Sequence, residues 1–231
     1  MLVFEDDGHT KCSAANGKVF CFQERTSGRD ALQTKDLPVG GTPTLAVRCE
    51  ISGSAECYIS SMELILVSMC LIGAKVRYNA TDSLVHDARL AKWADEGRLI
   101  AVCPEVMSGL STPRPATEII QGFDGEAVIK NQAQIIDENH VDFTEAYLRG
   151  ANVALELVKN HKIKMAVLKD GSPSCGRTYI YDGSFSGKTK TGMGSTAALL
   201  ESQGVKVFSE LQLDAAENYL ISIDKDYLKH L

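Results

Sequence analysis

Four short runs of mainly apolar residues recur along the chain after residue 61, and only the fourth contains a charged residue, Lys206. They are Leu64–Val67, Leu99–Val102, Met165–Leu168 and Val205–Phe208. A strand with apolar residues at successive positions is buried on both faces, which is typical of a parallel sheet covered by helices. The runs therefore predict four strands of one mainly parallel sheet.

Between these runs, apolar residues recur at helical spacing. Helices are predicted over Leu84–Trp93, with Asp82 or Ser83 as the N-cap, over Thr144–Lys162, and over Ser195–Gln203, which Gly204 closes in the C′ position. Strands that alternate with helices predict βαβ units. The expected fold class is therefore α/β: a Rossmann-like, mainly parallel sheet flanked by helices.

Two further segments predict hairpins. Ile119–Ile120 and Ala127–Ile129 flank the glycine-containing stretch Gly122–Gly125, which suits a turn. Tyr179–Gly187 predicts a second hairpin, or a lid over the binding crevice.

Residues 1–61 differ from the rest, because no helical or strand period persists there. Cys12, Cys21, Cys49 and Cys57 lie in this segment, but zinc ligands usually pair at two to four residues, so their spacing is only weak support for a metal. We interpret 1–61 as a poorly structured extension before an α/β domain over 62–231. A second interpretation is a misplaced start codon, with Met62 as the true start directly before the first strand.

Charge and composition exclude several classes of protein. The net charge of −6 makes a broad cationic surface for duplex nucleic acid improbable. The uncharged, apolar-leaning run Leu64–Ala74 has eleven residues, whereas a membrane span takes about 20. Met1–Phe4 leads into acidic residues, unlike a signal peptide, so we expect a cytoplasmic protein. Disulfides are rare in that reducing compartment, and the seven cysteines need another explanation.

Three cysteines follow three of the predicted strands: Cys70, Cys103 and Cys175. The carboxyl ends of parallel strands form the binding crevice of such sheets, so the three thiols should meet at one edge. Zinc would need a fourth ligand, and none of His86, His140 and His161 lies next to a strand end, with His86 and His161 expected on helices.

An iron–sulfur cluster is the other metal that three thiolates favour. A [4Fe–4S] cluster held by only three cysteines keeps one iron open, and an open iron is a Lewis acid with a preference for soft sulfur ligands. Inert buried thiols and a redox pair remain alternatives, although the chain has no Cys-x-x-Cys.

Other polar residues near the strand ends are weaker candidates. Glu105, fixed by Pro104, suits either a general base or a solvated carboxylate in a turn, while Ser172 suits substrate orientation, proton transfer or capping of a turn. Arg77 and Arg114 follow the first and second strands and suit either the binding of a carbonyl or phosphate or an ordinary place at the surface. The stretch before the helix at Ser195 favours ordinary capping over anion binding.

Several motifs together resemble the DUF523 family over about residues 62–210. They are Met62-Glu-Leu-Ile-Leu-Val-Ser-Met-Cys-Leu-Ile-Gly73, Val76-Arg-Tyr-Asn79, Val102-Cys-Pro-Glu-Val106, Pro113-Arg-Pro115, Lys169-Asp-Gly-Ser-Pro-Ser-Cys-Gly176, Tyr181-Asp-Gly-Ser-Phe-Ser-Gly187 and Gly194-Ser-Thr-Ala-Ala-Leu-Leu200.

This resemblance implies a [4Fe–4S] cluster held by Cys70, Cys103 and Cys175. It also implies that Glu105 and Ser172 are catalytic, in a desulfidase that removes sulfur from thiolated pyrimidines by hydrolysis without redox turnover. Met69 stands where a small residue is expected, which affects the shape of the pocket and not ligation.

The leading hypothesis is therefore a [4Fe–4S]-dependent desulfidase acting on a small thiolated nucleobase, nucleoside or nucleotide. No duplex nucleic acid and no membrane is expected as a partner, and the oligomeric state stays open. The alternative is a non-catalytic metal-binding module with an iron–sulfur cluster or zinc. A plain binding domain with inert thiols is a third possibility.

Overall fold

The computed structural model describes residues 62–120, 122–224 and 227, and the backbone of the strands within residues 2–60. The chain divides into two units, residues 1–42 and 43–231, and each is treated by itself. Among the helices that the structure describes, none combines the length and the apolar character needed to span a bilayer.

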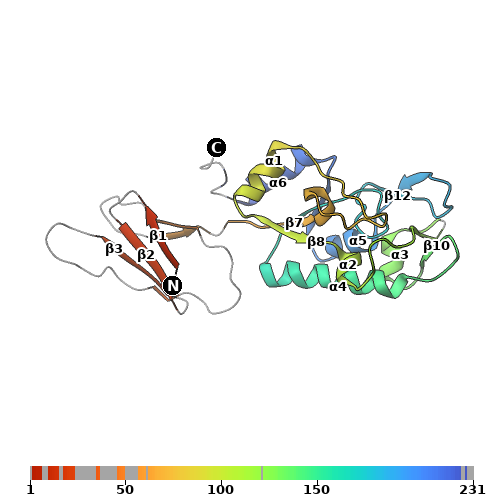
Figure 1. The fold of residues 1–231 in the computed structure, drawn as a ribbon, viewed down its shortest axis with the longest axis horizontal. Helices are drawn as coiled ribbons and strands as arrows, with labels where there is room; N and C mark the ends of the chain where they lie inside the picture. The colour runs from red at the N-terminus through yellow and green to blue at the C-terminus, as the bar shows by residue number, and fades with distance from the viewer. Residues whose placement is uncertain are drawn as a thin grey trace. The chain divides into compact units, whose positions relative to one another are not determined.

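The central sheet of the larger unit has four parallel strands (Figure 1). In chain order these are β7 (Ile65–Ser68), β8 (Leu99–Val102), β11 (Met165–Leu168) and β14 (Lys206–Ser209). All four predicted strands are confirmed, with shifts of one residue at β7 and β14. The spatial order is β14-β11-β7-β8, so the chain changes direction across the sheet between β7 and β11. Ligands of open parallel sheets bind at such a switch point.

Helices cover both faces of this sheet. α4 (Thr144–His161) and α5 (Ser195–Ser202) pack on one face, and α1 (Ala88–Asp95) and α6 (Leu213–Ile223) on the other (Figure 1). Side chains of a strand alternate between its faces. Accordingly Leu66 packs with the core of α4 and α5, whereas Ile65 and Val67 pack with that of α1 and α6. The predicted α/β class is thus confirmed as a three-layer fold.

Two of the three predicted helices have nearly the expected bounds. α4 ends at His161, and Lys162 follows as a left-handed C-cap with φ of 54°. α5 ends at Ser202, after which Gly204 has φ of 82°, as a C′ glycine should.

The third helix, α1, begins later than predicted. It starts at Ala88, with Asp87 as the N-cap whose carboxylate accepts the Arg89 N–H at 2.9 Å, so the prediction of Asp82 or Ser83 is wrong. The reason is a tertiary contact. The N–H groups of Ser83 and Val85 donate to the carbonyls of Cys70 and Leu71, which keeps this stretch extended.

The predicted hairpin of Ile119–Ile120 with Ala127–Ile129 is also wrong. Asp124 accepts the Glu126 N–H at 3.0 Å and so caps a helix, α3 (Gly125–Ile129). β9 (Thr117–Ile119) instead pairs antiparallel with β10 (Ile135–Asp137).

Four short elements complete the edge of the sheet at which its strands end. They are η1 (Met69–Ile72), α2 (Pro104–Met107), β12 (Tyr179–Tyr181) and β13 (Thr189–Thr191). β12 and β13 pair antiparallel, which confirms the second predicted hairpin and extends it to Thr191.

Residues 2–60 contain strands where the sequence shows no strand pattern. β1 (Leu2–Asp6), β2 (Thr10–Ala15), β3 (Lys18–Gln23) and β4 (Lys35–Asp36) form an antiparallel sheet, and β5 (Ala46–Cys49) pairs with β6 (Cys57–Ser60). The described part of the chain does not include the side chains of Cys12, Cys21, Cys49 and Cys57. Metal binding by these cysteines is therefore not tested. A true start at Met62 stays a prediction.

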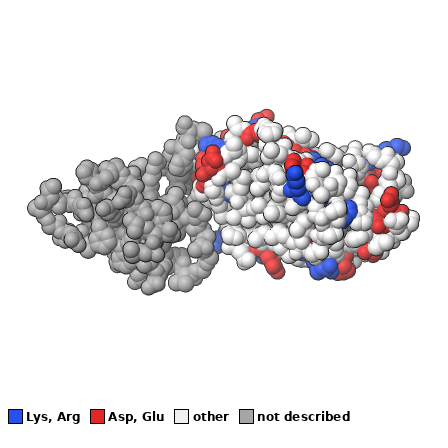
Figure 2. Space-filling model, in the orientation of Figure 1, with Lys and Arg blue, Asp and Glu red and all other residues white. Residues whose placement is uncertain are grey.

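On the face shown in Figure 2, acidic and basic side chains of the described residues lie interspersed among uncharged ones. This mixture is typical of an ordinary solvated surface.

Candidate active site

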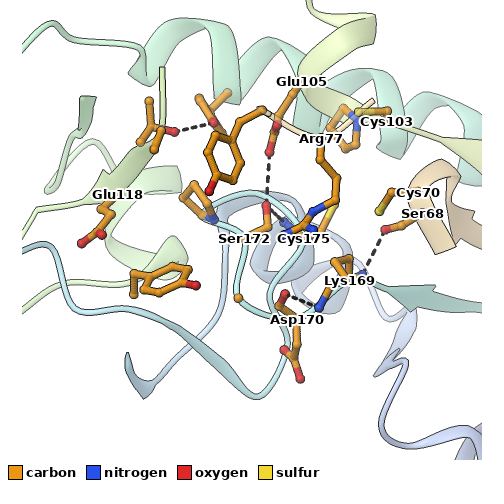
Figure 3. Close-up of a pocket in the computed structure, with 18 of the residues that line it drawn as sticks. Ser68, Cys70, Arg77, Cys103, Glu105, Glu118, Lys169, Asp170, Ser172 and Cys175 are labelled. Carbon is orange, nitrogen blue, oxygen red and sulfur yellow. Dashed lines mark hydrogen bonds between the residues drawn. The ribbon is translucent and has the colours of Figure 1, made fainter. Parts of the chain in front are cut away.

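A cavity of about 430 Å³ lies at the carboxyl edge of the sheet, and Cys70, Cys103 and Cys175 all line it (Figure 3). Cys70 lies in η1 directly after β7, Cys103 is the N-cap of α2 directly after β8, and Cys175 lies in the loop after β11. All three are free and buried. The structure therefore brings together the three cysteines that the strand ends predicted.

The thiols lie in a setting that disfavours their charged form. Burial raises the pKa of the Cys70 thiol to about 11, and nearby Cys103 adds to the shift, while Arg77 and Lys169 oppose it. Burial likewise raises the pKa of Cys103 and, strongly, that of Cys175. Thiolates in this pocket therefore need a bound cation, because a metal stabilises the deprotonated ligand.

The donor set fits an iron–sulfur cluster. Within residues 62–120 and 122–224, no three His, Cys, Asp or Glu side chains converge to hold one metal ion between them. The cysteines of a cluster bind different irons, so their sulfurs need not converge on one point. Three free, buried thiols on one wall of a cavity satisfy that requirement.

None of the histidines weighed as zinc ligands lines this cavity. His161 lies in α4 as predicted, but His86 precedes α1 and is not helical, which corrects that prediction. His140 lies in the turn after β10.

Ser172 both shapes the loop of Cys175 and contacts Glu105. Its hydroxyl oxygen accepts the N–H groups of Ser174 and Cys175, each at 3.1 Å. Its proton is donated to Oε1 of Glu105 at 3.1 Å (Figure 3). The oxygen thus caps the turn, as one interpretation of the sequence proposed, and the hydroxyl proton is directed at the carboxylate.

Glu105 lies in the first turn of α2 and is held from two sides. Oε1 accepts the Ser172 hydroxyl, and Oε2 forms an ion pair with Nη2 of Arg114. The side chains of Glu105 and Arg114 are only 13% and 4% exposed. Arg114 also donates to the carbonyl oxygens of Val76, at 3.1 Å, and Ser111, at 3.2 Å. Arg114 therefore orients the carboxylate, and its donors are largely occupied without a substrate.

Arg77 lines the cavity with few competing contacts. Its Nη1 is 3.5 Å from the Asp82 carbonyl oxygen, at the limit of a hydrogen bond. Of the two arginines singled out in the sequence, Arg77 is thus the one with donors to spare for a ligand.

Asp170 fixes the loop that carries Ser172 and Cys175. Its Oδ1 accepts the N–H groups of Arg177 at 2.7 Å and Thr178 at 2.8 Å, and its Oδ2 accepts the Thr178 hydroxyl. Burial alone would raise the pKa of Asp170, but the hydrogen bonds from Thr178 and Arg177 outweigh it and hold the pKa below its usual range.

The start of α5 is hydrogen-bonded to the loop that carries Ser172 and Cys175. The N–H groups of Ser195 and Thr196 donate to the carbonyl oxygens of Pro173 at 2.8 Å and Ser174 at 2.9 Å. A Cβ on Gly194 would stand 2.4 Å from the Ser174 oxygen, so only glycine allows this approach. These amides are therefore occupied, which supports capping over anion binding at this helix.

Sequence reasoning missed several residues that line the cavity. Ser68 accepts the Lys169 N–H at 3.0 Å, and its hydroxyl opposes the effect of burial on the pKa of the Cys175 thiol. Lys169 itself donates from Nζ to the Asp170 carbonyl at 3.0 Å and pairs with Glu210. Its position at the start of the Lys-Asp-Gly-Ser-Pro-Ser-Cys-Gly motif was the available signal.

The comparisons agree with this site. A family model described as 2-thiouracil desulfurase matches residues 65–212, so the chain belongs to this family and the resemblance to DUF523 is confirmed. The chain is 44% identical over 151 residues to the uncharacterized protein YbbK of Bacillus subtilis (strain 168), covering 65% of this chain and 98% of that protein.

A solved structure is also similar. It is that of the [4Fe–4S]-dependent thiouracil desulfidase TudS, at 42% identity and a TM-score of 0.62, covering 68% of this chain and 97% of that one. At this level of identity the two share the fold, and the family indicates an iron–sulfur desulfidase.

Proposed function

We propose that this chain is a desulfidase that converts the C=S group of a thiolated pyrimidine-like ring into C=O by hydrolysis, with a [4Fe–4S] cluster as cofactor. One observation carries the proposal: the cavity joins three free cysteines to a carboxylate held by Ser172 and Arg114. The name of the similar structure, which specifies both the cluster and thiouracil, supports the same assignment.

Cys70, Cys103 and Cys175 would hold the cluster. When bound, a cluster with three protein ligands supplies an open iron, a Lewis acid that takes the sulfur atom. The fold holds the three cysteines in fixed positions for the cluster. Asp170 fixes the loop of Cys175, and the strand ends fix the other two cysteines. Arg77 and Lys169 place positive charge beside the thiolates.

Glu105 would act as the general base. In the balanced reaction, water adds to the carbon of the C=S group. The C–S bond breaks, a C–O bond forms, and the sulfur leaves as sulfide without oxidation or reduction. Glu105 takes a proton from the attacking water. The Ser172 hydroxyl donates to Oε1 of Glu105 and so holds the carboxylate in place. Arg114 holds the other carboxylate oxygen, Oε2, and so orients Glu105.

The test uses anaerobically reconstituted protein and a set of thiolated pyrimidine bases, nucleosides and nucleotides, with released sulfide as the readout. Glu105→Gln should keep the visible absorption of the cluster but lose turnover by about 10²–10⁴-fold, the usual contribution of a positioned acid–base group. Glu156→Gln, an exposed carboxylate on α4, is the matched control and should leave turnover unchanged.

Two outcomes would overturn the proposal. Full turnover by Glu105→Gln at equal cluster content would leave Glu105 as a turn residue only. A stable cluster with no sulfide release from any thiolated pyrimidine would favour the non-catalytic metal-binding module.

A further inference from the structure

The loop between β12 and β13 lines the cavity and is hydrogen-bonded to Glu118, another lining residue. Asp182 N–H donates to the Lys188 carbonyl at 3.0 Å, which closes the loop. Oε2 of Glu118, on β9, accepts the N–H groups of Gly183 at 2.8 Å and Phe185 at 3.2 Å. Glu118 is buried and, like Phe185, lines the cavity (Figure 3).

The backbone of Phe185 is strained. Its φ is 54°, in the left-handed region where glycine is at ease and a bulky side chain is not. Gly183 and Gly187 on either side have φ of 86° and 78°, as their residue type allows. The loop therefore holds an aromatic residue in a costly conformation, with a buried carboxylate fastening its N–H.

Phe185 lines the cavity together with other aromatic residues. Tyr179 and Tyr181 from β12 line it as well, and Phe185 is only partly exposed. A flat heteroaromatic ring is recognised by stacking on such groups, which is tolerant of the ring's substituents.

We infer that Phe185 is the stacking residue for the ring of the substrate, and that Glu118 is a positioning residue that holds Phe185 in place. The inference rests on the proposed function and adds how the ring of the substrate is recognised: by stacking on its face.

Phe185→Gly separates this role from a structural one. Glycine removes the backbone strain, so the Tm of the variant should equal or exceed that of the unaltered protein. The KM for 2-thiouracil should rise by about 5- to 150-fold, the equivalent of ~1–3 kcal/mol for stacking of one base. kcat should stay within about threefold, because uniform binding is what the ring supplies.

Two companion variants make the result specific. Lys162→Gly relieves the same left-handed backbone at the end of α4, away from the cavity, and should raise the Tm without changing KM. Phe185→Tyr should keep the KM of the unaltered protein, because the ring is retained.

Glu118 is tested by hydrogen exchange and kinetics. Glu118→Ala should speed exchange at the Gly183 and Phe185 amides and raise KM as Phe185→Gly does, and the double variant should be no worse than either alone. Glu118→Gln keeps an acceptor oxygen and should restore most of the KM.

Equilibrium dialysis compares the affinity for 2-thiouracil with and without Phe185→Gly, and both proteins carry Glu105→Gln so that turnover does not consume the ligand. If Phe185→Gly binds 2-thiouracil as tightly as the unaltered protein, the inference is wrong. The same holds if its KM is unchanged or its Tm falls with KM intact. Absence of sulfide release from the unaltered protein would instead refute the proposed function, while a weaker affinity of the Phe185→Gly variant in dialysis would still support Phe185 as the stacking residue.

Discussion

Gly150, within α4, allows this helix to lie close to the backbone of α2, which carries residues of the site. A Cβ on Gly150 would stand 2.3 Å from the carbonyl oxygen of Pro104 and 2.7 Å from its carbonyl carbon. Side-chain carbons essentially never come closer than 3.0 Å to another heavy atom. Gly150→Ala must therefore push α2 away from α4 by several tenths of an ångström to about 1 Å, and α2 carries Cys103 at its N-cap and Glu105 in its first turn.

The two energetic effects of Gly150→Ala oppose each other. Alanine favours a helix interior by about 1 kcal/mol over glycine. Overpacking costs typically ~1–3 kcal/mol, and here the contact is with backbone, which yields little. We therefore expect a net destabilisation of about 0–2 kcal/mol, a fall in Tm of at most several degrees. Turnover should suffer more, by about 10²-fold, because a 1 Å displacement of a catalytic group has that effect.

The assay compares Gly150→Ala with Asn152→Ala, an exposed position two residues along the same helix. Both gain helix propensity, but only the first introduces a contact with α2. Thermal unfolding, iron content and sulfide release are measured for each. A Gly150→Ala protein that is about 1 kcal/mol more stable than the unaltered protein, with full turnover, would show that this helix contact does not place Glu105.

Three further predictions concern the cluster and its loop. Each of Cys70→Ser, Cys103→Ser and Cys175→Ser should abolish stable iron uptake, measured as iron per chain after anaerobic reconstitution; full uptake by any of them would remove that residue from the ligand set. The cluster should bleach in air, and saturating 2-thiouracil should slow the loss of visible absorption by occupying the open iron; equal rates with a ligand shown to bind would place it elsewhere. Because folding lowers the pKa of Asp170, the stabilisation by its carboxylate is present above the unfolded pKa of about 3.9 and is lost as pH falls through the folded value. Asp170→Asn should therefore lower the stability of the apo-protein by about 1–3 kcal/mol at pH 7. The difference in Tm between the variant and the unaltered protein should narrow below about pH 4, and a difference independent of pH would contradict this.

The sheet could be predicted because its information is local. Met165–Leu168, like the runs of β7 and β8, is apolar at every position, and such a strand is expected to be buried on both faces. α4 was predictable for the same reason, since its stripe persists over several turns. Once the strands were placed, the convergence of Cys70, Cys103 and Cys175 followed from their positions at strand ends.

The start of α1 and the identity of α3 could not be predicted, because they depend on contacts formed only in the folded chain. The late start of α1 results from hydrogen bonds of Ser83 and Val85 to the turn after β7, which only the folded chain supplies. Asp124 reads equally well as a turn residue or a helix cap, and the wrong choice replaced α3 with a strand. That error concealed Glu118, because its strand pairs with β10 and not with the residues of α3.

The claim that most needs testing is hydrolysis without redox chemistry. Reconstituted protein is incubated anaerobically with 2-thiouracil in H₂¹⁸O, without added oxidant or reductant, and sulfide and uracil are quantified together. We expect one sulfide for each uracil, ¹⁸O in the new carbonyl group of the product, and neither product from apo-protein. Sulfide release that requires a reductant, or uracil without ¹⁸O under conditions where the carbonyl does not exchange, would show that the reaction is not a hydrolysis without redox chemistry.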